Sequence, residues 1–207
     1  MARRAKPSGK SRHIRLSRLI GADQAFRIAL TIVESEGLWR DQEHDHDFPE
    51  FFWIQKGAGV HLVNGRRVEI SSGCACMMRP PDRHNFRGRP GEPLAIMNLA
   101  FPRTGLEHFR RRYFPKGGDY FWTRARLPWS RNLDGGTLRW LNASARELAG
   151  RTDSALVLDR FLIELFLRLE GGGRGREPLP EWLRAALDAW RTPEHFRGGA
   201  AGFVELC

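Results

Sequence analysis

The sequence has very few cysteines, and this sets a first limit on its class. Only Cys74, Cys76 and Cys207 occur among 207 residues. An odd and sparse set of this kind provides no disulfide framework, on which small extracellular domains depend. Cys74 and Cys76 alternate within an apolar stretch, where such pairs are usually small core residues. We therefore expect a protein of the reducing cytoplasm.

Long apolar runs are also missing. None approaches the roughly 18–20 residues that a membrane-spanning helix needs. The basic N-terminus is not followed by the apolar stretch, about 7–15 residues long, of a secretory signal. These two absences predict that neither a membrane nor a secretion pathway is involved.

Acidic residues are outnumbered, with 24 Asp and Glu against 34 Lys and Arg, so the formal charge is +10. No acidic residue occurs in the first eighteen positions, where arginine and lysine recur. Nucleic-acid binding is one interpretation of such a charge. A solvated tail is the other, and charge alone does not decide between them. We expect residues 1–12 to form a flexible basic arm.

Apolar residues are plentiful, at 41% of the chain, and exclude general disorder. Between residues 25 and 101 they form short runs separated by turns. The first run alternates from Phe26 to Val33, with the period of two that is typical of a strand. Asn64-Gly65 lies between two further runs and is a strong hairpin signal, because both residues of a type I′ turn need positive φ. Several short strands at this spacing predict a barrel or sandwich over residues 13–103.

Helical spacing replaces the strand pattern in the second half. Residues 106–114 form a possible short helix that ends before Pro115. Leu138, Leu141, Ala145 and Leu148 form one apolar stripe, and a second stripe runs from Leu158 to Leu169. We expect residues 104–170 to be a helical dimerisation segment, 171–180 a linker, and 181–191 a final helix. The predicted class is therefore α+β and mainly β, a jelly-roll barrel followed by helices.

The segment from His44 to Glu50 carries the strongest chemical signal. On an extended strand His44 and His46 project to one face, and Glu50 follows at an even spacing. His84 follows a Pro-Pro-Asp turn on an expected neighbouring strand. Two or three imidazoles and a carboxylate form a suitable ligand set for Zn, Ni, Fe or Mn. A hydrogen-bonded polar pocket without metal is the alternative interpretation.

Two further residues are candidates for ligand contact. Arg79 flanks the His84 region and is able to grip a hydroxyl, carboxylate or phosphate group. Trp53 follows Glu50 on the same expected strand, and aromatic rings stack on sugar faces, although a core tryptophan is the commoner case. The predicted ligand-binding set is thus His44, His46, Glu50, Trp53, Arg79 and His84.

Taken together, the His-x-His-x-x-x-Glu segment, Gly57, Gly73, Pro80 and His84 resemble the paired motifs of the cupin superfamily. The stretch from His44 to Phe101 resembles the sensor domain of AraC-family transcription regulators, closest in pattern to regulators of rhamnose and chitooligosaccharide operons. Residues 179–183 and 203–207 resemble the linker and the start of the first helix-turn-helix of such regulators. The second cupin motif departs from the usual pattern, because Pro80-Pro81-Asp82 stands in place of Pro-x-Gly.

The resemblance implies a cytoplasmic homodimer that binds a small molecule, a sugar above all, and reaches DNA through a C-terminal domain. That domain needs roughly a hundred further residues for two helix-turn-helix units, which this sequence does not contain. We therefore expect no reading of DNA bases by this chain. A metal-dependent cupin enzyme (a dioxygenase, isomerase or lyase) is the alternative function, since the same ligand set suits such chemistry.

Overall fold

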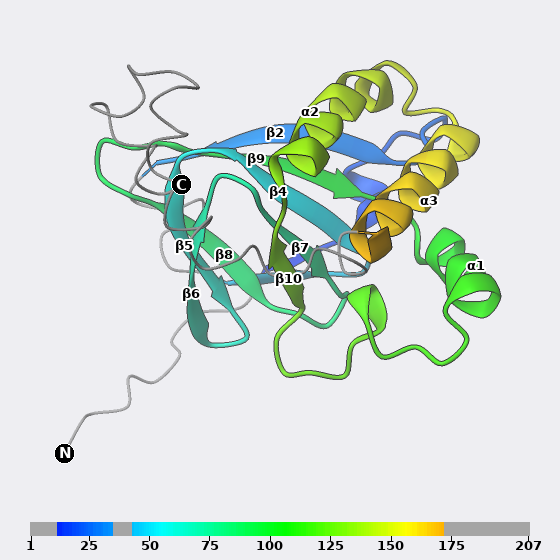
Figure 1. The fold of residues 1–207 in the computed structure, drawn as a ribbon, viewed down its shortest axis with the longest axis horizontal. Helices are drawn as coiled ribbons and strands as arrows, with labels where there is room; N and C mark the ends of the chain where they lie inside the picture. Colours follow the sequence, from blue (N-terminus) through cyan, green and yellow to red (C-terminus); the bar gives the residue numbers. More distant parts are fainter. Residues whose placement is uncertain (1–11, 35–42, 172–207) are drawn as a thin grey trace, which may run out of the picture. The chain divides into compact units, whose positions relative to one another are not determined.

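The computed structural model describes residues 12–34 and 43–171, which form ten strands, three α-helices and two short 3-10 helices (Figure 1). The predicted arm, linker, final helix and helix-turn-helix start lie outside these residues, apart from Arg12 and Gly171 at their edges. Residues 1–162 and 163–207 are two compact units, and the second includes the last turns of helix α3. None of the described helices has the length and apolarity that crossing a membrane requires.

The strands form two five-stranded sheets. The first sheet has the order β1 (Arg12–Ile14), β3 (His44–His46), β8 (His84–Gly88), β5 (Ala58–Val63) and β6 (Arg66–Ser71). The second has the order β10 (Trp129–Asn132), β7 (Cys74–Met78), β4 (Glu50–Lys56), β9 (Leu94–Ala100) and β2 (Arg27–Val33). These sheets confirm the predicted mainly β, jelly-roll class.

Apolar side chains of both sheets form the core. Phe52 and Ile54 of β4 and Phe86 of β8 belong to it, and so do Cys74 and Cys76, which confirms the expectation for the two cysteines. Asn64 and Gly65 have φ values of 49° and 71°, so the predicted type I′ hairpin is present between β5 and β6.

Strand β2 confirms the predicted alternation but turns its larger apolar side chains outward. Leu30 and Ile32 are 53% and 50% exposed. Arg27, Ala29 and Thr31 instead line a cavity inside the sandwich. The reason is that β2 is an edge strand, whose outer face is covered only in part where helix α2 packs against it.

The helices are α1 (Arg103–Tyr113), α2 (Gly135–Gly150) and α3 (Ala155–Gly171), and the 3-10 helices are η1 (Leu16–Arg18) and η2 (Tyr120–Trp122). Asp134 caps α2 by accepting hydrogen bonds from the amides of Gly136 and Thr137. Ser154 caps α3, because its Oγ accepts a hydrogen bond of 3.3 Å from the amide of Val157.

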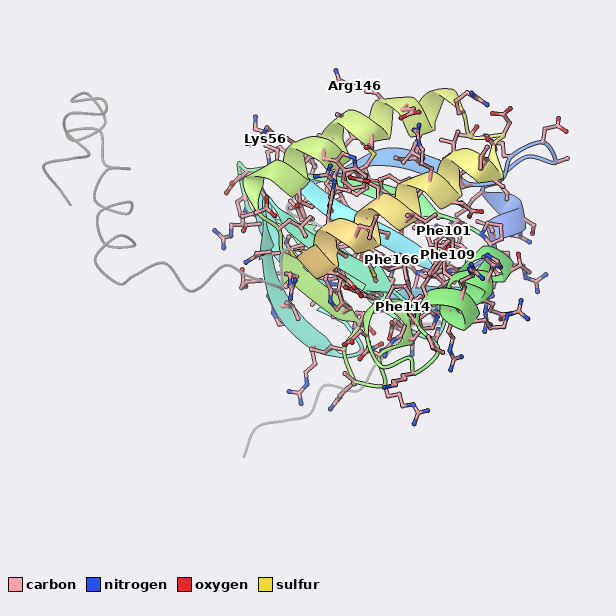
Figure 2. All side chains as sticks on the ribbon, turned by 45° about the vertical axis from the view of Figure 1, so that its right-hand side comes forward. Lys56, Phe101, Phe109, Phe114, Arg146 and Phe166 are labelled. Carbon is pink, nitrogen blue, oxygen red and sulfur yellow. The ribbon has the colours of Figure 1, made fainter. Side chains whose placement is uncertain are left out.

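Aromatic residues fill the side of the sandwich next to α1. Phe109 belongs to α1 and Phe101 lies close to this helix in Figure 2, and both are buried. The ring of Phe101 meets that of Phe121 edge-on, with centroids 5.7 Å apart. Strand β10 also lies in the stretch that the sequence predicts to be helical, and it extends the second sheet beside β7.

Candidate ligand and metal site

A cavity of about 260 Å³ lies between the two sheets. Its lining comes from β1, β2, β3, β4, β8 and β9, together with Leu19 and Phe48. Apolar groups cover much of it, and a smaller number of polar side chains cover the rest. This combination of an apolar wall and a few placed polar groups is typical of small-molecule sites.

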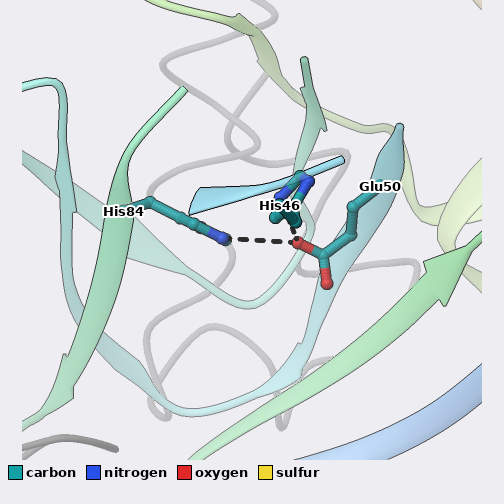
Figure 3. A group of neighbouring side chains, drawn as sticks. All are labelled: His46, Glu50 and His84. Atoms are coloured by element: carbon teal, nitrogen blue, oxygen red, sulfur yellow. Dashed lines mark ion pairs between the residues drawn. The ribbon is translucent and has the colours of Figure 1, made fainter. Parts of the chain in front are cut away.

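His46, Glu50 and His84 form the polar centre of the cavity (Figure 3). Their nearest ligand atoms all lie within 4.8 Å of one another. Glu50 Oε2 is 3.6 Å from His46 Nε2 and 3.5 Å from His84 Nε2. Among the described residues, none of these three buried atoms has a hydrogen-bond partner. Ligand atoms about 2.1 Å from one ion lie roughly 3.0–3.4 Å apart, so the two distances from Glu50 Oε2 are only slightly wider than those of a metal site.

The hydrogen bonding of His46 strengthens this fit. Its Nδ1 lies 2.6 Å from the carbonyl oxygen of Phe48. Because a carbonyl only accepts, Nδ1 carries the proton, and in the neutral ring Nε2 presents a lone pair to the Glu50 carboxylate. Two acceptors face each other there, and a cation or a further proton relieves their repulsion. Burial alone would lower the pKa of His46, but the Glu50 carboxylate and the Phe48 carbonyl raise it above its ordinary value.

His84 is neutral, and its Nδ1 faces a second buried histidine, His61. Burial, with His44, His61 and His46 nearby, holds its pKa well below the ordinary value. Its Nδ1 lies 3.3 Å from Nε2 of His61, a buried residue whose ring stacks on Phe86. His61 is not among the site residues predicted from the sequence. His61 and the buried Val63 are two residues apart on β5, so they share the inner face of this strand, and His61 lies next to His84.

His44 lies beside this centre rather than within it. It is the register partner of His84, and the two ring centroids are 4.3 Å apart. It lines the cavity but does not belong to the group of ligand atoms within 4.8 Å. Burial lowers its pKa to about 4, so it is a neutral donor or acceptor at pH 7. The structure thus brings together three of the four predicted metal ligands and places the fourth next to them.

Trp53 departs from the predicted ligand contact. On β4 the side chains of Glu50 and Phe52 face inward, so Trp53, an odd number of residues away from Glu50, faces outward. Its Nε1 donates a hydrogen bond of 2.9 Å to Asn142 Oδ1 on helix α2. It is fully buried but does not line the cavity. The period of the strand contains this information, since an even spacing is needed to share the face of Glu50.

Arg79 also departs from its predicted role as a ligand clamp. Its guanidinium pairs with Asp82 and donates to the carbonyls of Thr123 and Ala125, at 2.7 and 2.8 Å. These contacts fix the loop that follows β7 to the segment after η2. Arg79 is absent from the cavity lining, so its charge is used within the fold.

Two arginines that the sequence analysis did not select line the cavity instead. Arg12 lies on β1 and Arg27 on β2, the edge strands of the two sheets. Arg12 falls in the stretch interpreted as a tail, and Arg27 sits between apolar residues of the alternating strand. The alternation of β2 was the available signal for Arg27, but the period alone does not say which face of the strand turns inward.

Comparisons with known proteins place the chain. The family model of the AraC-like ligand binding domain matches residues 33–166. The transcriptional activator RhaS of Yersinia pestis is 42% identical over 77 residues, which are 34% of this chain and 28% of that protein. The crystal structure of apo ToxT K231A from Vibrio cholerae covers 80% of this chain and 63% of its own, with 11% identity and a TM-score of 0.56. The ToxT match concerns the fold alone. Because the family model covers well over half of the sequence, the chain belongs to the AraC-like ligand binding domain family.

Proposed function

We propose that the cavity binds a small hydroxylated molecule of the carbohydrate class and that binding controls a DNA-binding region outside this chain. The single observation that carries the proposal is the convergence of histidines and a carboxylate in a cavity within the fold of a ligand-sensing family. Hydroxyl groups both donate and accept hydrogen bonds, so neutral imidazoles and a carboxylate suit them. A volume of about 260 Å³ fits a molecule of monosaccharide size.

The same proposal includes a divalent transition metal, Zn, Ni, Fe or Mn, held by His46, Glu50 and His84. The unpartnered buried atoms and their spacing support it. When bound, the ion supplies Lewis-acid attraction for oxygen atoms of the ligand. His44 then lies next to the bound oxygens, and its neutral ring orients them by hydrogen bonding.

The wider assembly is part of the proposal. RhaS is a transcriptional activator by name, and the matched region is only 28% of its length. We place DNA binding in sequence beyond this chain, and we place the protein in the cytoplasm as a homodimer formed through its helices. Sensing then means that the ligand binds two conformations of the domain with different affinity and shifts their populations.

Metal analysis of the full chain, purified without chelator, tests the central step. We expect nearly one metal ion per chain in the unmodified protein and a large loss in the His46→Gln variant. His108→Gln is the matched control, because His108 is an exposed histidine on α1. Equal metal content in all three proteins, or none in the unmodified one, would count against the metal. Calorimetric titration with monosaccharides then tests the ligand class.

A metal-dependent cupin enzyme is the second candidate function. The observation in its favour is the donor set, since two histidines and one carboxylate leave coordination positions open for a substrate. Turnover by the iron- or manganese-loaded protein, lost in His46→Gln, would establish it. Binding of the same compounds without any product would leave the sensor as the function.

A further inference from the structure

Two arginines face the ligand cavity from opposite sheets. Arg12 is the register partner of His44, which pairs in turn with His84. Arg27 is the register partner of Ala100, which pairs in turn with Glu50. Register partners share a face of their sheet, and all six residues of these two rows line the cavity. Each row therefore leads from an arginine on an edge strand to a residue of the metal centre.

The two rows give the cavity a basic end and a metal end. Arg27 and Glu50 are two strand spacings apart, on the order of 10 Å between backbones, with the small side chain of Ala100 between them. Arg12 and Arg27 are both exposed, so the basic end reaches the solvent. A molecule of monosaccharide size that enters here is long enough to touch both ends.

The charges of the lining are unequal. Two guanidinium groups, those of Arg12 and Arg27, stand against the single carboxylate of Glu50. A divalent metal at the inner end adds further positive charge. Arg27 has no ion pair among the described residues, so a neutral ligand leaves its charge without a counterion, whereas an anion pairs with it.

The position of Arg27 suits it to hold an anion. Among the described residues its side chain makes one hydrogen bond, of 3.2 Å from Nη1 to the carbonyl oxygen of Leu19, and no ion pair. That bond orients the guanidinium, whose planar fork matches the two oxygens of a carboxylate or phosphate. Arg79 shows the contrasting case in this same chain, because its fork is already occupied by Asp82.

We propose that the ligand is an acidic carbohydrate, a sugar acid or sugar phosphate, whose anionic group is held between Arg12 and Arg27 while its hydroxyl groups reach the His46–Glu50–His84 centre. The proposal rests on the proposed function and makes it more specific. The shared chemistry is a compact hydroxylated body with one anionic group at the end that faces the edge strands.

Matched pairs of neutral and acidic sugars test the proposal by calorimetry on the full chain. The pairs are galactose with galacturonate, glucose with glucuronate, and glucose with glucose 6-phosphate. We expect at least one acidic member to bind about tenfold or more tightly than its neutral partner, since charge-assisted hydrogen bonds are stronger than neutral ones. The uronate and phosphate pairs distinguish the two sources of the anion.

Charge-removing variants show where the anion binds. Arg12→Gln and Arg27→Gln are each expected to weaken binding of the acidic sugar about tenfold. Metal content is expected to stay unchanged, because neither residue is a proposed metal ligand. Arg83→Gln is the control for the loss of one positive charge, since Arg83 is exposed and does not line the cavity. Thermal unfolding without ligand verifies that each variant is folded.

The outcomes separate this inference from the proposed function. Neutral sugars that bind as tightly as their acids, with no effect of Arg27→Gln, would refute the acidic ligand and leave a carbohydrate sensor in place. Loss of binding in Arg83→Gln as well as in Arg27→Gln would also refute it, because net charge and not the site would then be responsible. Failure of every sugar, neutral or acidic, would refute both proposals.

Discussion

His46 shows how a single residue determines the character of the cavity. Its Nδ1 donates a hydrogen bond to the Phe48 carbonyl oxygen, so its Nε2 is the nitrogen that faces the Glu50 carboxylate. His84 Nε2 faces the same carboxylate, and the His84 Nδ1 contacts Nε2 of His61. Partners behind the ligand atoms fix the tautomer and orientation of metal-binding histidines.

The bracing of His84 gives the first prediction. Replacing His61 with Leu removes the nitrogen that faces His84 Nδ1 at 3.3 Å, so the His84 ring loses its fixed tautomer. We expect the affinity for Zn²⁺ to fall about 10–100-fold, the usual effect of losing such a partner. Competition with a chromophoric chelator measures it, with His108→Leu as the control. An unchanged affinity would mean that His61 only fills space between Phe52 and Phe86.

Acid stability gives the second prediction. Burial lowers the pKa of His44 to about 4 and of His61 to about 3, and it lowers that of His84 as well. His44 is faced by Glu50, His46, Arg12 and Asp45, and His61 by Asp82 and His44. The unfolded chain binds protons near pH 6.5 while the folded chain does not, so stability falls as the pH drops below about 6.5.

His46 opposes this trend, because its pKa is raised and its contribution is greatest at low pH. Three histidines have a lowered pKa and one has a raised pKa, so stability is still expected to fall as the pH drops. Urea unfolding of metal-free protein at pH 7 and pH 5 is expected to show a loss on the order of 1–3 kcal/mol. The His61→Leu variant is expected to lose less between these two pH values. Equal stability at both would show that the buried histidines accept protons without cost.

At the scale of the elements, strand β4 presents a different chemistry on each face. Glu50 faces the cavity, and Trp53 faces helix α2, where Asn142 Oδ1 accepts from Trp53 Nε1 and from Gln55 Nε2, at 2.9 and 3.0 Å. One amide oxygen thus ties two side chains of the strand to the helix.

This arrangement predicts that Trp53→Phe affects stability and not binding. The variant loses one buried hydrogen bond and some packing volume, so we expect about 1–3 kcal/mol less stability. Metal content and ligand affinity are expected to stay unchanged, because Trp53 lies outside the cavity. Chemical unfolding and calorimetry measure the two effects. Weaker ligand binding by a folded Trp53→Phe protein would support the sequence-based prediction that Trp53 contacts the ligand.

The elements also show what the sequence could reveal. The hairpin at Asn64-Gly65 and the helical stripes are local patterns, and the structure confirms both. His46, Glu50 and His84 come together from three strands of two sheets, so their convergence depends on the whole fold, and their role as ligands stays a prediction. Strand β10 was missed because its four residues, WSRN, carry no alternation and become a strand only by pairing with β7. The inner position of Arg27 was missed because which face of β2 turns inward depends on its neighbours in the sheet.

For the molecule as a whole, the proposed metal site draws its residues from both sheets. His46 and His84 belong to the first sheet, and Glu50 belongs to the second. In the absence of metal, the sheets are held here by apolar packing and by contacts longer than a hydrogen bond. An ion bound by all three side chains would tie the sheets together next to the cavity.

We therefore expect metal to stabilise the whole sandwich. A ligand that binds only the folded state adds RT ln(1 + [L]/Kd), which is about 2.7 kcal/mol at a hundredfold excess over Kd. Added Zn²⁺ is expected to raise the unfolding midpoint of the unmodified chain and of His108→Gln by several degrees, and to leave Glu50→Gln unchanged. Glu50→Gln keeps the shape of the side chain but removes the charge that joins the second sheet to the site. If Glu50→Gln were stabilised as much as the unmodified chain, the ion would bind within the first sheet alone, and the cavity would be free to open between the sheets with metal bound.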